Sequence, residues 1–340
     1  MNRPLEPTIS DVAKAADVSR STVSRVFSRP ERISEATILR VREAAERLGY
    51  SPNPTARALS TGQHRNIAVF VPDVANPFFP PLIAEVQTEA EATDRCVFLG
   101  SSGESAEREV RLARRLAAQV EGMVLVSPRM QDEEILILAA RCPLVLVNRD
   151  LVGLPRVLID SAAGTREAVL HLAALGHASV VYVAGPEASW SNAERRTAVE
   201  RAGAEAGLKV RIVPAETPTF EGGRGALKAL LRVGATAVIA FDDLVAQGIL
   251  AGLAERRVAV PDACSVIGCD DVLGAATWPA LTTVSNRSEE AGRKAFQLLL
   301  GRLERRDSVQ ARHVLTTSLV IRQTTAPAAR KTTRTDGGRR

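Results

Sequence analysis

The sequence of residues 8–59 is TISDVAKAADVSRSTVSRVFSRPERISEATILRVREAAERLGYSPNPTARAL. Apolar residues recur in it at helical spacing in three short runs, which predicts three amphipathic helices joined by turns of a few residues. Thr8 and Asp11 form a Ser/Thr-x-x-Asp/Glu pattern, which indicates the start of a first helix over about residues 9–16. Helices this short and this close together are typical of a helix-turn-helix unit.

The second predicted helix carries the residues that would face a partner. Ser19 is a good N-cap for it, and Val23, Val26 and Phe27 fall on its inward face. The outward face carries short hydroxyl side chains and long cations, which suit phosphates and base edges in a DNA major groove. A three-helix bundle with a solvated face is the alternative, but the helix spacing and the basic excess of this region favour DNA binding.

A third helix and a much shorter segment follow. Ser34 predicts the N-cap of the third helix, which should end at Gly49. Asn53 and Pro54 then begin a segment of little more than one helical turn. A helix this short needs a partner to be stable. We therefore expect it to fold against its dimer counterpart or against DNA, with Leu59 as a wedge in the minor groove.

The length of the chain predicts more than one domain, and its charge is unevenly distributed along the sequence. Its 340 residues exceed one ordinary domain, and its formal net charge is +5. Residues 1–65 hold eleven basic and seven acidic residues, and residues 322–340 hold six basic residues and one acidic residue, so both ends are basic and the middle is mildly acidic. The positive charge at both ends of the chain is consistent with binding to an anionic partner. The last residues are polar and lack periodicity, so we predict a disordered basic tail over 323–340.

Several classes of protein are disfavoured by what the sequence lacks. Its four cysteines form no CxxC or Cys/His cluster, so we expect neither a metal site nor a disulfide framework. Nucleotide-binding and nucleophile motifs are missing as well, so we expect no cofactor and no enzymatic activity. The N-terminal residues have no apolar core of a signal peptide, and no run is long enough for a membrane helix. The expected location is the cytoplasm.

The larger part of the chain alternates apolar, strand-like runs with helical stretches. Unbroken apolar strands separated by helices predict parallel sheets covered on both faces. Two such lobes would hold a ligand between them, at the carboxyl ends of the strands. Any α/β enzyme remains an alternative on this pattern alone. The predicted strands lie at 67–71, 96–100, 122–126, 144–148, 180–184, 210–213, 237–240 and 264–268.

The chain resembles the lactose/galactose-repressor (LacI/GalR) family of bacterial regulators. The resemblance is dense in the first part, at TISDVAKAA, VSRSTVSRV and LGYSPN, and continues to about residue 322 at VPDVANPFF, HLAALGH, WSNAER, VPDACSVIGCDD and PALTTV. It implies an N-terminal all-α helix-turn-helix head and an α/β two-lobed body like the periplasmic binding proteins, with two doubly wound parallel sheets. The implied domains are a head (1–50), a hinge with a short helix (51–63), an effector-binding and dimerisation body (64–322) and the tail (323–340).

The resemblance also implies the DNA-contacting residues. Arg20 and Ser21 would read operator bases at the start of the second helix. Further contacts with bases or backbone would come from Thr22, Ser24, Arg25, Ser28 and Arg32. The hinge helix would act through Ala56, Arg57 and Leu59. One departure is Asp17, where the family has Gly in the turn, although Asp tolerates a left-handed backbone better than most residues.

Effector residues follow from the same resemblance. An apolar wall, an amide, carboxylates and an arginine around an aromatic face would suit a polyhydroxylated ligand. The implied residues are Phe78, Phe79, Asn148, Ser191, Arg195, Phe220, Asp242 and Asp270. Two departures stand out, because Asp242 replaces the usual Asn and Cys269 replaces the common aromatic. Asp242 as a helix cap and Phe220 as a core residue are the structural alternatives.

The predicted function is a homodimeric repressor of transcription that binds palindromic double-stranded operator DNA. Its operator affinity would be switched by a small polar effector, with a sugar expected. A corepressor-type regulator that senses a purine or nucleoside is an alternative within the family. Outside it, the alternatives are a cytoplasmic solute-binding protein and an α/β enzyme with a fused DNA-binding head.

Overall fold

The computed structural model describes residues 7–51, 65–285, 287–304 and 311–328. Their contacts divide the chain into two compact units, residues 1–65 and residues 66–340. The first unit is the head and the second is the body. Apart from Ser51, the predicted hinge segment lies outside the described residues, and so does the predicted hinge helix.

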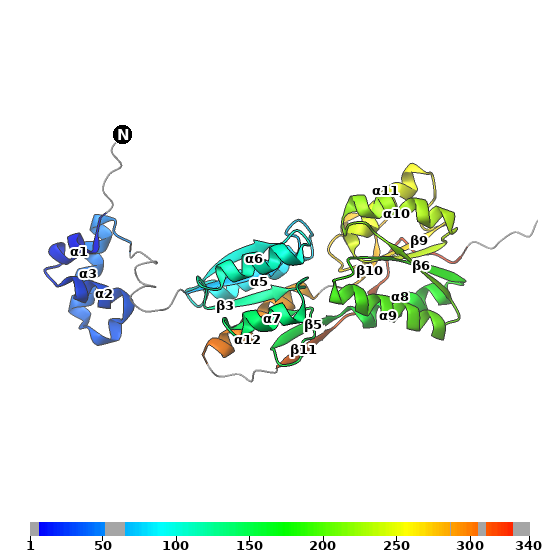
Figure 1. Cartoon of the computed structure of the whole chain (residues 1–340). Coiled ribbons are helices and arrows are strands. Elements are labelled where there is room, and N and C mark those ends of the chain that lie inside the picture. Colours follow the sequence, from blue (N-terminus) through cyan, green and yellow to red (C-terminus); the bar gives the residue numbers. More distant parts are fainter. Residues whose placement is uncertain (1–6, 52–64, 286, 305–310, 329–340) are drawn as a thin grey trace, which may run out of the picture. The chain divides into compact units, whose positions relative to one another are not determined.

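The head is a bundle of helices around a small core (Figure 1). Val12, Val23 and Val41, one from each main helix, are wholly buried together. The main helices lie within one residue of the predicted positions, and the loop between the last two forms a turn of 3-10 helix, η1. The elements are α1 (Ile9–Ala15), α2 (Arg20–Ser28), η1 (Pro30–Arg32) and α3 (Glu35–Leu48).

The ends of these helices are stabilised as the sequence predicts. The Thr8 backbone N–H and hydroxyl both donate to Asp11 Oδ2, at 2.8 and 2.7 Å. Ser19 Oγ accepts from the Thr22 backbone N–H at 3.1 Å and caps α2. The turn residue Asp17 has φ 50°, the left-handed conformation for which Asp substitutes for Gly, and Gly49 ends α3 with φ 66°.

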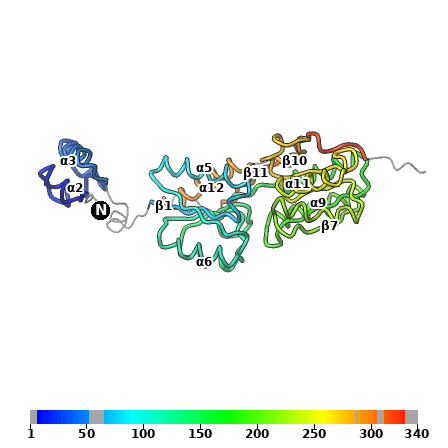
Figure 2. The backbone as a smooth tube through the Cα atoms, turned by 90° about the horizontal axis from the view of Figure 1, so that it is seen from above, coloured from blue at the N-terminus to red at the C-terminus, as the bar shows by residue number. Residues whose placement is uncertain are grey.

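The first lobe of the body is a six-stranded sheet in the order β11-β5-β4-β3-β1-β2, with every pair parallel. Alternate residues of β1 enter different cores, Val69 on one face and Phe70 on the other, as the period of two in a strand requires. Figure 2 shows α5 and α12 on one side of β1 and α6 on the other. The strands are β1 (Asn66–Val71), β2 (Cys96–Ser101), β3 (Gly122–Val126), β4 (Leu144–Val147), β5 (Arg156–Asp160) and β11 (Arg312–Thr316). The helices are α5 (Phe79–Glu91), α6 (Ala106–Leu116), α7 (Asp132–Ala139) and α12 (Ser288–Leu303).

The second lobe repeats this plan in the order β12-β10-β9-β8-β6-β7. Its pairs are parallel except β10 with β12, which is antiparallel. The strands are β6 (Ser179–Ala184), β7 (Lys209–Pro214), β8 (Ala237–Ala240), β9 (Ser265–Cys269), β10 (Thr282–Val284) and β12 (Leu319–Val320), with a 3-10 turn, η2 (Gly274–Ala276), after β9. The helices are α8 (Ser161–Ala174), α9 (Trp190–Glu205), α10 (Phe220–Arg232) and α11 (Asp243–Glu255). The predicted strands correspond to β1–β4 and β6–β9, whereas β5, β10, β11 and β12 were not predicted.

The chain passes between the lobes three times, after β5, after β10 and after β11. The body also extends further than predicted. Thr324 is wholly buried, its carbonyl accepts from the Val266 N–H at 2.8 Å, and its hydroxyl accepts from the Thr282 N–H at 2.8 Å. Residues 323–328 are therefore part of the second lobe, and the predicted boundary at 322 is too early. Pairing of their backbone with β9 and β10 is a tertiary contact that a polar sequence does not reveal. Residues 329–340 of the predicted tail lie outside the described residues.

Candidate effector cleft and DNA-reading helix

A small polar cavity lies between the two lobes of the body. Its walls come from loops and helix starts that follow the carboxyl ends of the strands, as expected for parallel sheets. The free space is about 30 Å³, which is enough for roughly one or two water molecules. The lining residues are Asn76, Phe78, Phe79, Glu104, Ser127, Arg129 and Asn148 of the first lobe, and Ser189, Ser191, Arg195, Pro218, Phe241, Asp242 and Asp270 of the second.

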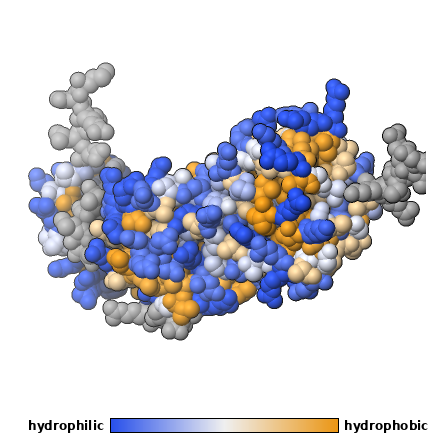
Figure 3. Space-filling view, turned by 45° about the vertical axis from the view of Figure 1, so that its right-hand side comes forward, coloured by the Kyte–Doolittle hydropathy of each residue, from blue (hydrophilic) through white to orange (hydrophobic). Residues whose placement is uncertain are grey.

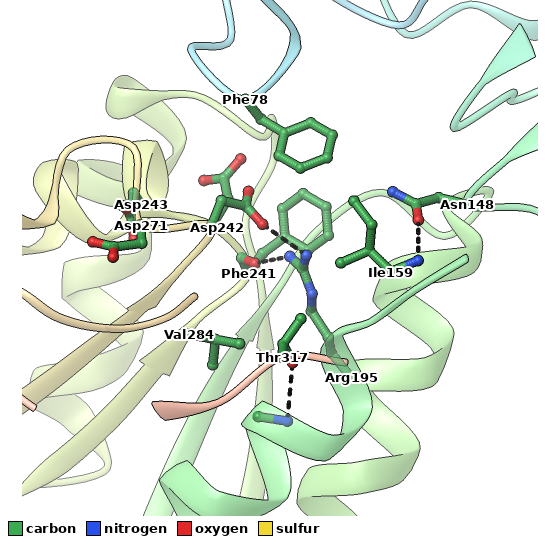
Figure 4. A network of polar contacts seen from close by, with 12 residues as sticks. Phe78, Asn148, Ile159, Arg195, Phe241, Asp242, Asp243, Asp271, Val284 and Thr317 are labelled. Carbon is green, nitrogen blue, oxygen red and sulfur yellow. Dashed lines mark hydrogen bonds and ion pairs between the residues drawn. The ribbon is translucent and has the colours of Figure 1, made fainter. Parts of the chain in front are cut away.

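Arg195 is the buried cation of this cleft (Figure 4). It projects from α9 and is 6% exposed. Its Nη2 donates to Asp270 Oδ1 at 2.9 Å, its Nη1 donates to the Phe241 carbonyl, and the guanidinium carbon lies 5.1 Å from the centre of the Phe241 ring. The buried Nε has no hydrogen-bond partner within the protein. A ligand oxygen would satisfy this donor, which is otherwise left unpaired at a cost.

Asp242 combines a structural role with a place in the cleft. Its Oδ1 accepts from the Val245 N–H at 2.8 Å and caps α11. Its Oδ2 accepts from Asn76 Nδ2 of the first lobe at 2.9 Å. Burial, together with the nearby charge of Asp270, raises the pKa of Asp242 to about 7. Asp242 therefore caps α11 and also lines the cleft.

Asp243 positions the loop that begins at Asp270. It was not among the predicted site residues. It is wholly buried. Its Oδ1 accepts from the Thr283 hydroxyl at 2.6 Å, and its Oδ2 accepts from the Val272 and Leu273 N–H groups at 3.0 and 3.1 Å. Burial raises the pKa of this carboxyl to about 7. These bonds fix the loop that begins at Asp270, and so they hold the partner of Arg195 in place.

The first lobe supplies aromatic rings and polar groups. The rings of Phe78 and Phe79 meet edge to face with centroids 5.1 Å apart. Asn148 is held by the Ile159 N–H, which donates to its Oδ1 at 3.0 Å. Because that bond uses the oxygen, the amide nitrogen of Asn148 stays available for a ligand.

A salt bridge forms another part of the first-lobe wall. Arg129 Nε lies 2.5 Å from Glu104 Oε2, and Arg129 Nη1 donates to the Ser127 carbonyl at 2.8 Å. The backbone of this loop is held by the wholly buried Glu109 of α6. Glu109 Oε2 accepts from the Arg129 and Met130 N–H groups at 2.7 and 2.8 Å. Burial raises the pKa of Glu109.

We expect Glu109→Ala to destabilise the body by about 2 kcal/mol, because two buried N–H groups of the Arg129 loop lose their acceptor. Urea unfolding of the full chain at pH 7 measures the loss. Glu107→Ala is the control, because Glu107 is an exposed acid on the same helix and its removal should change stability by less than about 0.5 kcal/mol. Equal stability of the two variants would show that Glu109 does not hold the loop.

The cleft includes seven of the eight predicted effector residues, and Phe220 is the exception. Phe220 begins α10, which packs closely against α11 through glycines: a Cβ added at Gly248 would lie 1.9 Å from the Phe220 carbonyl. Phe220 lines a separate hollow, together with Leu250 and Trp278. The prediction that Phe220 stacks on a ligand does not agree with this structure, in which Phe241 is the aromatic residue beside Arg195.

Seven lining residues were not predicted: Asn76, Glu104, Ser127, Arg129, Ser189, Pro218 and Phe241. Ser127 and Phe241 directly follow β3 and β8, so the rule that parallel strands present their carboxyl ends to a ligand would have selected these two. Four lining residues have positive φ although they are not glycine, namely Glu104, Ser127, Asn148 and Asp270, with φ of 63°, 47°, 53° and 99°. Such conformations gather at ligand sites.

In the head, the predicted DNA-contacting residues of α2 and the following loop lie on the surface. Arg20, Ser21, Arg25 and Arg32 are exposed, and Thr22, Ser24 and Ser28 are partly exposed. Their hydroxyls are ordered by local bonds, such as Ser19 Oγ to Ser21 Oγ at 2.7 Å and Ser28 Oγ to the Ser24 carbonyl at 2.8 Å. The hinge residues Ala56, Arg57 and Leu59 lie outside the described residues.

Comparisons with known proteins agree with both units. Residues 8–53 match the family described as bacterial regulatory proteins, lacI family, and residues 169–325 match a periplasmic binding protein-like domain. The HTH-type transcriptional repressor CytR of Escherichia coli strain K12 is 31% identical over 327 residues, which cover 94% of this chain and 96% of CytR. The chain belongs to the lacI family of bacterial regulatory proteins.

Other lacI-family proteins are similarly related. The HTH-type transcriptional regulator GalR of Escherichia coli strain K12 is 32% identical, covering 93% of this chain and 94% of GalR. The structure of the Lac repressor dimer bound to operator and the anti-inducer ONPF has a TM-score of 0.84 at 26% identity, covering 94% of this chain and 99% of that chain. A lacI-family regulator from Enterococcus faecalis V583 with bound ribose has a TM-score of 0.71 at 27% identity, covering 78% of this chain and 100% of that chain.

The family assignment confirms the predicted fold class and the prediction of a DNA-binding transcriptional regulator with a ligand-binding domain. These relatives are regulators, in agreement with the expectation that the chain is not an enzyme. No helix among the described residues is long and apolar enough to cross a membrane. In the same part of the chain, no group of three or more His, Cys, Asp or Glu side chains is arranged to hold a metal ion.

Proposed function

We propose that this lacI-family protein is a homodimeric repressor that binds palindromic operator DNA and is switched by a small polyhydroxylated effector, a sugar, bound between the lobes. The observation that carries the proposal is the polar cleft between the lobes, which is lined by Arg195, Asp242 and Asp270 of the second lobe and by Phe78 and Phe79 of the first. Charged and amide groups would bind hydroxyls, and the aromatic rings would pack against the apolar face of a sugar ring. Because it acts on chromosomal DNA, the protein would work in the cytoplasm.

The switch follows from linkage between the two sites. A ligand that favours one arrangement of the lobes changes operator affinity, and the operator must then change ligand affinity by the same factor. The hinge residues 51–63 join the head to the body in sequence, so a change in the lobes would reach the DNA-binding head through this segment. Induction, in which the sugar weakens operator binding, is the expected sign.

A nucleoside is the second candidate effector, acting as corepressor or inducer. Its support is the number of aromatic rings in the cleft, because Phe78, Phe79 and Phe241 offer faces and edges against which a base could stack. A thermal-shift screen of the full chain with sugars, polyols and nucleosides would separate the two, since a specific ligand at 100 times its Kd stabilises the protein by about 2.7 kcal/mol.

The dimer would form through an apolar face of the second lobe. Apolar side chains gather on this lobe in the view of Figure 3. Trp278 is 89% exposed, and with Phe220 and Leu250 it lines a hollow of about 430 Å³. An exposed tryptophan at the rim of an apolar hollow is typical of a protein–protein interface. A second copy would fill the hollow and bring two heads to a palindrome.

Operator recognition is tested by Arg20→Ala. We expect a mobility shift with the protein's own upstream DNA to show 5- to 150-fold weaker operator binding, because one bidentate contact with a base gives about 1–3 kcal/mol of discrimination. Arg40→Ala is the control, since Arg40 is an exposed arginine on α3 rather than α2. Failure of the wild-type protein to bind any palindrome there at low salt, with or without the screened compounds, would contradict the proposal.

A further inference from the structure

Residues 323–328 cross the second lobe as a short strap, drawn in red in Figure 2. The strap contains no helix or strand, so its contacts with the rest of the lobe decide whether it stays in place. The Gln323 N–H donates to the Ala280 carbonyl at 2.8 Å, and the Ala328 N–H donates to the Leu175 carbonyl at 2.9 Å. The two ends of the strap are therefore attached to the segment before β10 and to the C-terminal end of α8.

His177, in the turn between α8 and β6, holds the middle of the strap. It is 5% exposed. Its Nε2 lies 3.2 Å from the Ala326 carbonyl oxygen and 3.1 Å from Ser265 Oγ, and its Nδ1 lies 3.2 Å from Thr236 Oγ1. A carbonyl oxygen can only accept a hydrogen bond, so Nε2 carries the proton and Nδ1 of the neutral ring accepts from the Thr236 hydroxyl. The neutral ring therefore uses both of its nitrogens.

A second histidine contacts the neighbouring residue of the strap. His171, on the last turn of α8, places its Nε2 3.0 Å from Thr325 Oγ1. Burial lowers the pKa of His171, and the charge of a protonated His177 lowers it further. Burial also lowers the pKa of His177, and its bond with the Ala326 carbonyl opposes this effect only in part. Both rings are therefore held in the neutral form where the strap covers them.

The charged side chains on the surrounding elements have other partners. On α8, Glu167 Oε2 accepts from the Leu319 N–H at 2.8 Å. Just before the strap, Arg322 Nη2 pairs with Asp271 Oδ1 at 2.7 Å. Strands β9 and β10 contribute hydroxyl groups. Among the described residues, no carboxylate raises the pKa of either ring. A proton added to one ring would be buried beside a second histidine without a compensating negative charge, which is unfavourable.

We propose that the strap is a proton-sensitive clasp of the second lobe, which stays docked while His171 and His177 are neutral and is released when they take up protons. The inference goes beyond the proposed function, because it involves neither the cleft nor the DNA-binding head. Release lets water reach both rings and removes the cost of charging them. It also removes the contacts of residues 323–328 with β9 and β10.

The direction of the pH dependence follows from the number of protons that each state binds. In water the ordinary pKa of histidine is about 6.5. Well above this pH both rings are neutral in the docked and the released state, so docking does not depend on pH. Below it the released state binds more protons, so docking weakens as the pH falls. At pH 5.5 each ring that is neutral only when docked favours release by about 10-fold, and the two together by about 100-fold.

Hydrogen exchange of the full chain tests the clasp at the amides of Gln323, Ala326 and Ala328, which all donate within the lobe. Protection factors remove the intrinsic pH dependence of exchange. Between pH 7.5 and pH 5.5 they should fall by about 5- to 100-fold at these amides. The reference is Val124, a wholly buried residue of β3 in the first lobe. An equal fall at Val124, or no fall in the strap, would overturn the proposal.

The role of the histidines is tested by His171→Gln/His177→Gln. Glutamine has an amide nitrogen that can donate to the Ala326 carbonyl and it does not titrate, so strap protection should not change with pH in this variant. His313→Gln is the matched control, because His313 lies on β11 of the first lobe, and it should keep the wild-type fall. A fall in the double variant as large as in wild type would contradict the proposal. If the double variant does not fold, His171→Gln alone should reduce the wild-type fall by up to about 10-fold.

Two shortened chains test the clasp without any substitution. A variant that ends at Ala328 keeps the strap and should unfold at the temperature of the full chain, whereas a variant that ends at Arg322 lacks it. At pH 7.5 the second should unfold at least about 4 °C below the first. At pH 5.5 the strap contributes less, so the difference should shrink to less than half. The same difference at both pH values would show that protons do not control the strap.

Discussion

Arg195→Ala is expected to remove the effector response and to lower the free energy of unfolding by about 3–5 kcal/mol, because it leaves a buried carboxylate without its cation. Asp270 is 8% exposed and lies 2.9 Å from Arg195 Nη2, so no bulk solvent replaces the lost charge. The shift in unfolding temperature with the compounds of the screen measures the effector response, and urea unfolding measures the free energy of unfolding.

Arg196→Ala is the matched control for this prediction. Arg196 is the next residue on the same helix, and its ion pair with Glu200 is about half exposed on both sides, so its removal should cost less than about 0.5 kcal/mol. If the two variants unfold alike and respond alike to ligand, the cleft is not the effector site.

Arg195→Lys separates binding from folding. The lysine keeps a positive charge near Asp270 but cannot reproduce the planar fork that reaches both Asp270 and the Phe241 carbonyl. We expect this variant to remain folded and to bind operator DNA within about threefold of wild type, while its ligand response falls by at least tenfold. A normal ligand response in Arg195→Lys would show that only the charge of the residue matters.

Trp278→Glu is expected to convert the dimer to monomers at micromolar concentration and to weaken operator binding by at least 100-fold. A charge placed in an apolar interface loses its water without gaining a partner. Two linked heads bind a palindrome about 10²- to 10⁴-fold better than one head, because the second head binds at high effective concentration. Sedimentation velocity measures the oligomeric state, and a mobility shift measures operator affinity.

The Trp278→Glu variant should change dimerisation without unfolding the monomer, because a side chain that is 89% exposed contributes little to the stability of the monomer. Val152→Glu is the control, since Val152 is 75% exposed but belongs to the first lobe, outside the hollow beside α11. A Trp278→Glu protein that remains dimeric would place the interface elsewhere. A monomeric variant that binds the palindrome as well as wild type would contradict the need for two heads.

The sequence alone predicts the head almost completely. Its helix starts depend on local bonds, such as Thr8 with Asp11 and Ser19 with Thr22, which involve residues three positions apart. Its core follows the spacing of Val12, Val23 and Val41. These signals are local in the chain, so they can be read without a tertiary structure. The same holds for the central strands of the body, where long apolar runs indicate burial on both faces.

Four strands, β5, β10, β11 and β12, and the end of the body were not predicted in this way. Strands β11 and β12 are partly exposed and far in sequence from the strands they pair with. Residues 323–328 have no apolar run, and they belong to the second lobe because Thr324 and Ala326 form hydrogen bonds with strand residues 42 and 61 positions earlier. Hydrogen bonds between distant segments leave no periodic signal.

In the cleft, sequence determined the kinds of residue and tertiary structure decided their arrangement. The resemblance to the family identified Arg195, Asp242 and Asp270 as candidates, because the motifs that carry it are local in the sequence. Phe220 lines a separate hollow beside α11 instead of the cleft, and the placement of the two lobes brings Asn76 within 2.9 Å of a carboxylate 166 positions away. Which polar side chains meet depends on how the two sheets are placed relative to each other. Three connecting segments and the contacts between the lobes in the cleft set that placement.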